Sequence, residues 1–119
     1  MIRRALGPGL AADEQVILRS QGGYKDNVRP IWKLGTFYLT NQRLLLFVPT
    51  GILFETPLSN IQEVRVEEQR YIAGRMKEAI AIGYRNSANQ RHSKAWLVMP
   101  DLETWRQKIY ERTLLELDP

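Results

Sequence analysis

The 119-residue sequence contains no cysteine and only one histidine. The missing cysteines exclude disulfide bonds, thiolate metal sites and cysteine nucleophiles. They also fit a reducing compartment, so we expect a cytoplasmic protein. The single histidine, His92, lies in a polar stretch beside Arg91, whose positive charge disfavours a protonated imidazole. We interpret it as a solvated loop residue.

The short motifs of common catalytic and phosphate-binding sites are also missing. The chain has no Gly-x-Ser-x-Gly nucleophile elbow, no Gly-x-x-x-x-Gly-Lys loop and no His/Asp cluster with ligand spacing. The adjacent Glu67 and Glu68 point to opposite faces of a predicted strand, so they cannot act as a joint carboxylate pair. We therefore expect no enzymatic activity, no cofactor and no bound metal.

Long hydrophobic runs are absent as well. The longest, residues 44–48, is far shorter than the ~20 residues of a membrane-spanning helix. Arg3 and Arg4 resemble the charged start of a signal peptide, but the Gly7-Pro8-Gly9 that follows interrupts any apolar stretch. We expect a protein that is soluble or binds a membrane peripherally. Residues 1–13 are predicted to be mobile and residues 14–117 to form one domain.

Short apolar segments alternate with turn signals from residue 14 to residue 99. Period-two alternation and β-branched or aromatic residues predict seven strands, with mostly antiparallel neighbours. The stretch 21–27 contains Gly22 and Gly23 and is predicted to be a polar loop. A second polar stretch, 85–93, links the last two strands. The predicted strands are residues 16–19, 31–40, 43–48, 52–56, 61–68, 79–84 and 94–99.

The end of the chain has a helical pattern instead. Pro100 followed by Asp101 predicts a helix start, with the Asp101 carboxylate accepting N–H bonds from the first turn. Leu102, Trp105 and Ile109 recur at the spacing of one helix face. A partial barrel of two packed antiparallel sheets is the natural partner for this face, with Trp105 as the largest side chain of the plug.

Further leucines follow this stripe. Thr113 and Leu117 extend it, whereas Leu114 and Leu115 fall off it. These two leucines either fray, contact a partner, or belong to a helix that continues in a longer chain.

One segment resembles a known family. Residues 34–47 read Leu-Gly-Thr-Phe-Tyr-Leu-Thr-Asn-Gln-Arg-Leu-Leu-Leu-Phe. This resembles the central hairpin of GRAM and related pleckstrin-homology (PH)-like domains, which carry Gly-x-Leu-Tyr-Leu-Thr-Asn-x-Arg-Leu-x-Phe. Residues 54–61 are similar to the family's Ile-Pro-Leu-x-x-Ile segment, and Trp105 lies where the terminal helix often keeps a tryptophan. The resemblance implies a mainly β, PH-like partly open barrel of about seven strands, capped by an amphipathic C-terminal helix.

The net charge of +4 is unevenly distributed. Residues 1–60 hold seven basic and four acidic side chains, residues 61–100 hold seven and four, and residues 101–119 hold three and five. The strand region therefore carries +6 and the helical region −2. Such a polarised charge favours a domain that presents one face to an anionic surface.

The resemblance also implies where this charge acts. In PH-like domains the first, third and sixth inter-strand loops lie together at the open end opposite the helix. Basic residues there would bind a lipid headgroup or membrane surface, each contributing ~1 kcal/mol. The alternative is that they only solvate the loops. The first hairpin lacks the Lys-x(n)-Lys/Arg-x-Arg signature of phosphoinositide-binding members, so stereospecific recognition is not expected. The candidate residues are Lys25, Arg29, Lys33, Arg85, Arg91 and Lys94.

Three apolar or aromatic residues are candidates for membrane or partner contact. Trp32 is either an interfacial anchor or a core residue that starts a strand. Tyr71 and Ile72 lie in a polar loop and form either a wedge or a small packing cluster. The predicted function is a non-catalytic module at an anionic phospholipid surface; the alternative is protein interaction or self-assembly, including a homo-oligomer. Nucleic-acid binding is not expected, because it needs a row of exposed strand aromatics beside basic residues.

Overall fold

The computed structural model describes residues 8–113. Within this range the chain forms a seven-stranded sheet and one α-helix, joined by short turns and two 3-10 segments, η1 (Leu58–Asn60) and η2 (Ile72–Gly74). The elements are β1 (Val16–Asp26), β2 (Lys33–Thr40), β3 (Arg43–Val48), β4 (Gly51–Pro57), β5 (Ile61–Arg70), β6 (Met76–Arg85), β7 (His92–Val98) and α1 (Leu102–Arg112).

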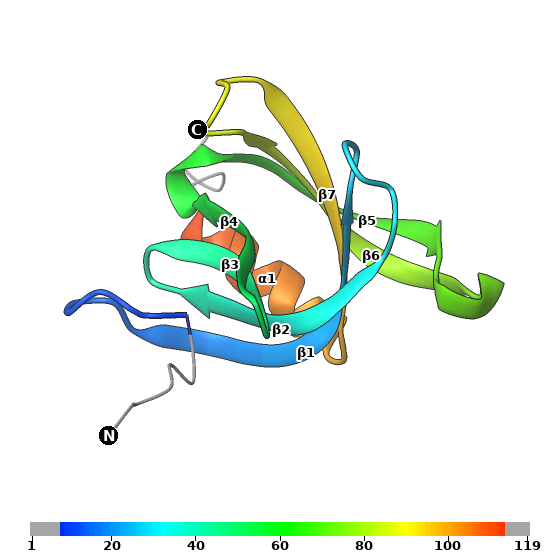
Figure 1. The fold of residues 1–119 in the computed structure, drawn as a ribbon, viewed down its shortest axis with the longest axis horizontal. Coiled ribbons are helices and arrows are strands. Elements are labelled where there is room, and N and C mark those ends of the chain that lie inside the picture. The colour runs from blue at the N-terminus through cyan, green and yellow to red at the C-terminus, as the bar shows by residue number, and fades with distance from the viewer. Residues whose placement is uncertain (1–7, 114–119) are drawn as a thin grey trace.

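All neighbouring strands are antiparallel, in the order β4-β3-β2-β1-β7-β6-β5. The sheet curls around the core, and β4 and β5 remain as two edges that do not pair with each other (Figure 1). α1 lies within the curl, as expected for a helix that covers the open barrel. The prediction of a mainly β partial barrel of about seven strands with one C-terminal helix is confirmed.

The core lies between the sheet and the stripe of α1. Trp105 is only 2% exposed, and its ring packs edge-on against Phe37 with 6.2 Å between centroids. Ile109, the next residue of the stripe, is fully buried. Leu44 and Leu46 of β3 belong to the same core, whereas Leu45, between them, is buried on the other face of the sheet. Packing of a helix stripe against a strand interior is thus what stabilises the barrel.

The predicted loop 21–27 is wrong, because β1 continues to Asp26. A Cβ on Gly22 would come within 2.2 Å of the Val98 carbonyl oxygen, and one on Gly23 within 2.3 Å of the Tyr71 hydroxyl. These glycines therefore permit close packing within a strand rather than a turn.

Two smaller expectations also differ from the structure. Asp101 has a left-handed backbone (φ 57°) and no side-chain capping bond; its carbonyl instead accepts the Trp105 N–H at 3.1 Å. His92 begins β7 rather than lying in a loop, and its Nδ1 is 3.1 Å from Gln62 Oε1. The predictions for Leu114, Leu115 and Leu117 lie outside the described residues.

A polar network closes the β2–β3 hairpin. Thr40 Oγ1 accepts the N–H groups of Gln42 and Arg43 at 3.0 Å and donates to Glu14 Oε2 at 2.7 Å. The buried Glu14 carboxylate also receives Arg43 Nε at 2.8 Å. Three hydrogen bonds to the Glu14 carboxylate, from Arg43, Thr40 and the Ala11 N–H, lower its pKa from 4.5 to about 2. The bond from Arg43 is the largest cause. The segment before β1 is thus joined to the hairpin by a buried ion pair.

The β5–β6 hairpin reaches past the rest of the sheet (Figure 1). β6 pairs with β5 from Met76 onward but with β7 only from Ile80 onward. Among the described residues, the first residues of β6 therefore have a strand neighbour on one side only.

Candidate functional site

At one end of the barrel, the β1–β2 loop, the start of β4 and the β6–β7 loop enclose a cavity of about 190 Å³. We call it the mouth. The structure thus brings together the first and sixth inter-strand loops and Leu53 of β4 at this cavity, whereas the β3–β4 turn does not line it. It is lined by Tyr24, Asp26, Val28, Arg29, Ile31, Lys33, Leu53 and Asn86.

Apolar and basic side chains alternate along the rim of the mouth. Val28 is 72% exposed and Ile31 is 64% exposed, which is unusual for large aliphatic residues in a folded protein. Arg29 and Lys33 are also exposed, and neither makes an ion pair within residues 8–113. The rim therefore offers exposed apolar surface beside two cations that make no ion pair, with Asp26 as the one acidic residue of the lining.

Asp26 holds the β1–β2 loop in shape. Its Oδ1 accepts the N–H groups of Val28 at 2.9 Å and Arg29 at 2.7 Å, which fixes a turn directly after β1. Its Oδ2 accepts the Tyr24 hydroxyl at 2.7 Å. Burial, and then this bond to a carboxylate, raise the pKa of Tyr24 well above its usual range, so the hydroxyl remains a donor. The loop tip is thus anchored to a buried side chain.

Two of the predicted basic residues lie elsewhere, on the outer face of β1 and β7. Lys25 Nζ lies 5.0 Å from the ring centroid of Trp32 and 5.2 Å from that of Trp96. Lys94 Nζ lies 5.2 Å from the Trp96 ring and 2.9 Å from Glu67 Oε2. Their charges are therefore held by aromatic rings and a carboxylate rather than presented at the mouth. We call these five residues the tryptophan cluster.

Glu67 is the anionic centre of the tryptophan cluster. Its Oε1 accepts the indole N–H of Trp96 at 3.0 Å. This bond, followed by the bond from Lys94, lowers the pKa of the Glu67 carboxyl. Arg65 also lies within 3.5 Å of Glu67 Oε2. The charge of Lys94 is thus matched locally.

Of the two roles proposed for Trp32 from the sequence, the structure contradicts the core role, and the role of interfacial anchor stays a prediction. Trp32 is half-buried and lies outside the hydrophobic core. Its indole N–H donates to the Arg70 carbonyl at 2.8 Å, and its ring packs edge-on against Tyr71 at 4.8 Å. Trp32 and Tyr71 therefore link the β1–β2 loop to the β5–β6 hairpin. Ile72 lies exposed at the tip of that hairpin.

The remaining predicted residues, Arg85 and Arg91, flank the β6–β7 loop and are exposed. The Arg85 carbonyl accepts a bond from Asn60, and Asn86, the next residue, lines the mouth. The six predicted basic residues therefore divide into three pairs. Arg29 and Lys33 line the mouth, and Arg85 and Arg91 border the β6–β7 loop. Lys25 and Lys94 belong to the tryptophan cluster.

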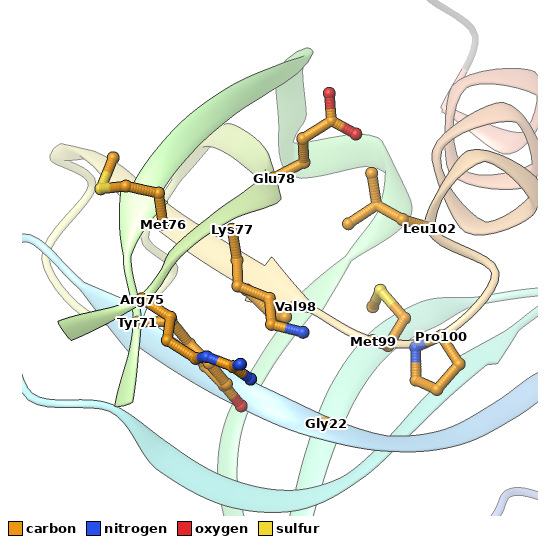
Figure 2. A pocket seen from close by; sticks show the side chains of 10 residues that line it. All are labelled: Gly22, Tyr71, Arg75, Met76, Lys77, Glu78, Val98, Met99, Pro100 and Leu102. Atoms are coloured by element: carbon orange, nitrogen blue, oxygen red, sulfur yellow. The ribbon is translucent and has the colours of Figure 1, made fainter. Parts of the chain in front are cut away.

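A second recess lies where β7 ends (Figure 2). We call it the β6 groove; its volume is about 690 Å³. Arg75 and Lys77 extend into it in Figure 2. The basic run from Arg70 to Lys77 was visible in the sequence, but nothing there indicated a recess beside it. The groove is lined by Gly22, Tyr71, Arg75, Met76, Lys77, Glu78, Val98, Met99, Pro100 and Leu102.

Within residues 8–113, no group of three or more His, Asp or Glu side chains is placed to hold a metal ion. No helix in this range is long and apolar enough to cross a membrane.

Comparison with protein-family models and with curated proteins finds no match to this chain. Among solved structures, the chain is similar to one described as the Vps36 N-terminal PH domain, with a TM-score of 0.58 and 15% sequence identity. The similarity covers 92% of this chain and 86% of the other. It supports the PH-like fold, whereas the GRAM resemblance of residues 34–47 stays a prediction. At this identity the similarity concerns the fold alone.

Proposed function

We propose that the protein is a non-catalytic binding module that attaches peripherally to an anionic membrane surface through the mouth. The observation that carries the proposal is the rim of the mouth, where Val28 and Ile31 are exposed beside Arg29 and Lys33. Side chains that cost free energy in water and charges without a partner are both stabilised at the boundary between lipid headgroups and acyl chains.

The two kinds of side chain would act in sequence. Arg29 and Lys33 attract the protein to anionic lipid, at about 1 kcal/mol each near the surface. Val28 and Ile31 then leave water, which contributes roughly 1–2 kcal/mol each for aliphatic side chains already exposed. The resulting attachment is reversible and weakens with salt.

Vesicle sedimentation tests this proposal. The wild type is expected to pellet with phosphatidylserine-containing vesicles at low salt and to be released at high salt. Charge reversal at the rim, Arg29→Glu with Lys33→Glu, should lower vesicle affinity by at least roughly thirtyfold, because loss of the two cations alone removes about 1 kcal/mol each and the new carboxylates are repelled. Val28→Ser with Ile31→Ser should also weaken binding while leaving its dependence on anionic lipid intact.

A matched control exists on α1. Lys108→Glu with Arg112→Glu makes the same change in net charge on an element that does not line the mouth. This variant should keep most of the wild-type affinity. Equal losses for the two charge reversals would mean that net charge, rather than the mouth, governs binding and would contradict the proposal.

Self-association is the competing function. β4 is an edge strand, and its residues Ile52 and Leu53 are exposed. Open apolar edges can pair with a second copy of the same chain. A mass that rises with protein concentration, without any affinity for anionic vesicles, would favour this alternative.

A further inference from the structure

We propose that the β6 groove binds an extended, acidic peptide segment of a partner protein, which lies as an added strand beside the first residues of β6. This interaction is separate from the proposed membrane attachment, because no residue that lines the groove also lines the mouth.

The backbone at the groove has room for a strand. β6 pairs with β5 through Arg70 and Met76, but its ladder with β7 begins only at Ile80. After Val98 the chain leaves the sheet, and α1 begins at Leu102. Within the described residues, the start of β6 therefore has no strand on its groove side. Its main-chain donors and acceptors are available to an extended segment, as in other cases of strand addition.

β1 borders the same recess from the other side. β1 pairs with β7 only from Gly23 to Asp26, so its earlier part also has a strand neighbour on one side within residues 8–113. Gly22 lies at this border and lines the groove. The groove thus opens where β7 stops. Beyond that point β1 and the start of β6 run apart (Figure 1), so an added strand would pair with β6 alone.

Three charged side chains line the groove, and two of them, Arg75 and Lys77, are basic, whereas Glu78 is acidic. The two cations favour acidic residues in an occupant. Arg75 and Lys77 are two positions apart, point into the recess (Figure 2), and make no ion pair within residues 8–113. Side chains two apart on a strand lie on one face, roughly 7 Å from each other. An added strand with acidic residues at alternate positions would place its carboxylates opposite both cations.

Apolar side chains supply the rest of the surface. Met76 is 53% exposed on the opposite face of β6 from Lys77, and Val98, Met99 and Leu102 form the far wall. An occupant with apolar residues between its acidic ones would cover this surface. A lipid headgroup would satisfy Arg75 and Lys77 but would leave the strand edge unpaired and Met76 exposed, whereas Met99 is already buried in the core. A peptide therefore fits more of the groove.

Fluorescence anisotropy with two matched peptide pools tests the proposal. One pool carries Glu at alternate positions with randomised apolar residues between, and the other carries Lys at those positions. The Glu pool should bind and the Lys pool should not. Arg75→Glu with Lys77→Glu should lower the affinity for the Glu pool about tenfold or more, from two exposed charge pairs. The mouth variant Arg29→Glu with Lys33→Glu should leave it unchanged.

Backbone methylation separates strand addition from simple charge attraction. Methylating the amide nitrogens of one alternate set in the Glu peptides should abolish binding, whereas methylating the other set should not, because only one set faces β6. Several results would overturn the proposal: no binding by the Glu pool, equal binding by both pools, or equal tolerance of both methylation patterns. Loss of vesicle binding in the Arg75→Glu/Lys77→Glu variant, without any peptide binding, would instead assign the groove to the membrane. Circular dichroism confirms that each variant is folded.

Discussion

The mouth and the tryptophan cluster combine basic side chains with large apolar ones, yet the two surfaces differ in how the charges are compensated. At the mouth, Arg29 and Lys33 make no ion pair in the described range, and the neighbouring Ile31 is exposed. In the cluster, Lys25 lies between two indole rings and Lys94 bonds to a carboxylate. The two pairs of basic residues are therefore not equivalent. Those at the mouth are available to a ligand, and those in the tryptophan cluster stabilise the fold.

Both surfaces depend on the same core. The largest expected loss of stability therefore comes from removing Trp105, which packs α1 against the sheet. Trp105→Ala should lower the free energy of unfolding by about 4 kcal/mol, because it removes a buried ring that packs on Phe37. Thermal and chemical denaturation followed by circular dichroism measure this. Trp105→Phe serves as the control and should cost less, since a ring remains. If Trp105→Ala melted at the same temperature as the wild type, the claim that Trp105 holds α1 onto the barrel would be contradicted.

A buried ion pair should have an intermediate effect. Glu14→Gln leaves Arg43 without its closest carboxylate and should cost about 2 kcal/mol. Glu55→Gln removes the more exposed carboxylate from the same arginine and should change stability by less than about 0.5 kcal/mol. Equal costs for the two changes, measured by urea denaturation, would show that burial of Glu14 is unimportant.

The same carboxylate gives a pH dependence of known sign. The Glu14 pKa is about 2 in the folded protein and near 4.5 in the unfolded chain, so unfolding takes up a proton between these values. The stabilisation is complete above about pH 4.5 and should be lost as the pH falls toward 2. In Glu14→Gln, the dependence of stability on pH over this interval should be shallower than in the wild type. Parallel curves would contradict the assignment.

The smallest effect compares the two surfaces directly. Lys25→Met removes a cation from between two rings and should cost about 1 kcal/mol of stability. Lys33→Met, the matched change at the mouth, should alter stability by less than about 0.5 kcal/mol and should weaken vesicle binding instead. If the two variants changed stability equally, or if Lys25→Met weakened vesicle binding more, the distinction between the surfaces would fail.

Local sequence patterns were sufficient to predict the number and order of the strands and the terminal helix. Alternation in β2 to β6 and the stripe of Trp105 and Ile109 depend on neighbours in sequence, so the order of elements could be predicted. Gly22 and Gly23 were misinterpreted because the reason for their small size lies in Val98 and Tyr71, which are distant in sequence.

The sites were harder to predict for the same reason. The surroundings of the Lys25 side chain depend on the register of β1 with β7, which places Lys25 opposite Trp96. The β6 groove depends on where β7 stops relative to β6, and neither strand alone indicates this. The exposure of Val28 and Ile31 likewise depends on the turn that Asp26 fixes. Sequence composition could place positive charge near loops, but only the strand pairing decides which charges are free.

The absence of cysteine makes a direct measurement of the central claim possible. A nitroxide attached to Ile31→Cys gives a single label at the mouth, and one attached to Tyr110→Cys gives a control on α1. On addition of phosphatidylserine-containing vesicles, electron paramagnetic resonance should show that the label at position 31 becomes shielded from a water-soluble relaxant and accessible to oxygen. The label at position 110 should remain exposed to water. A label at position 31 that stays in water while the protein is bound to vesicles would contradict the account.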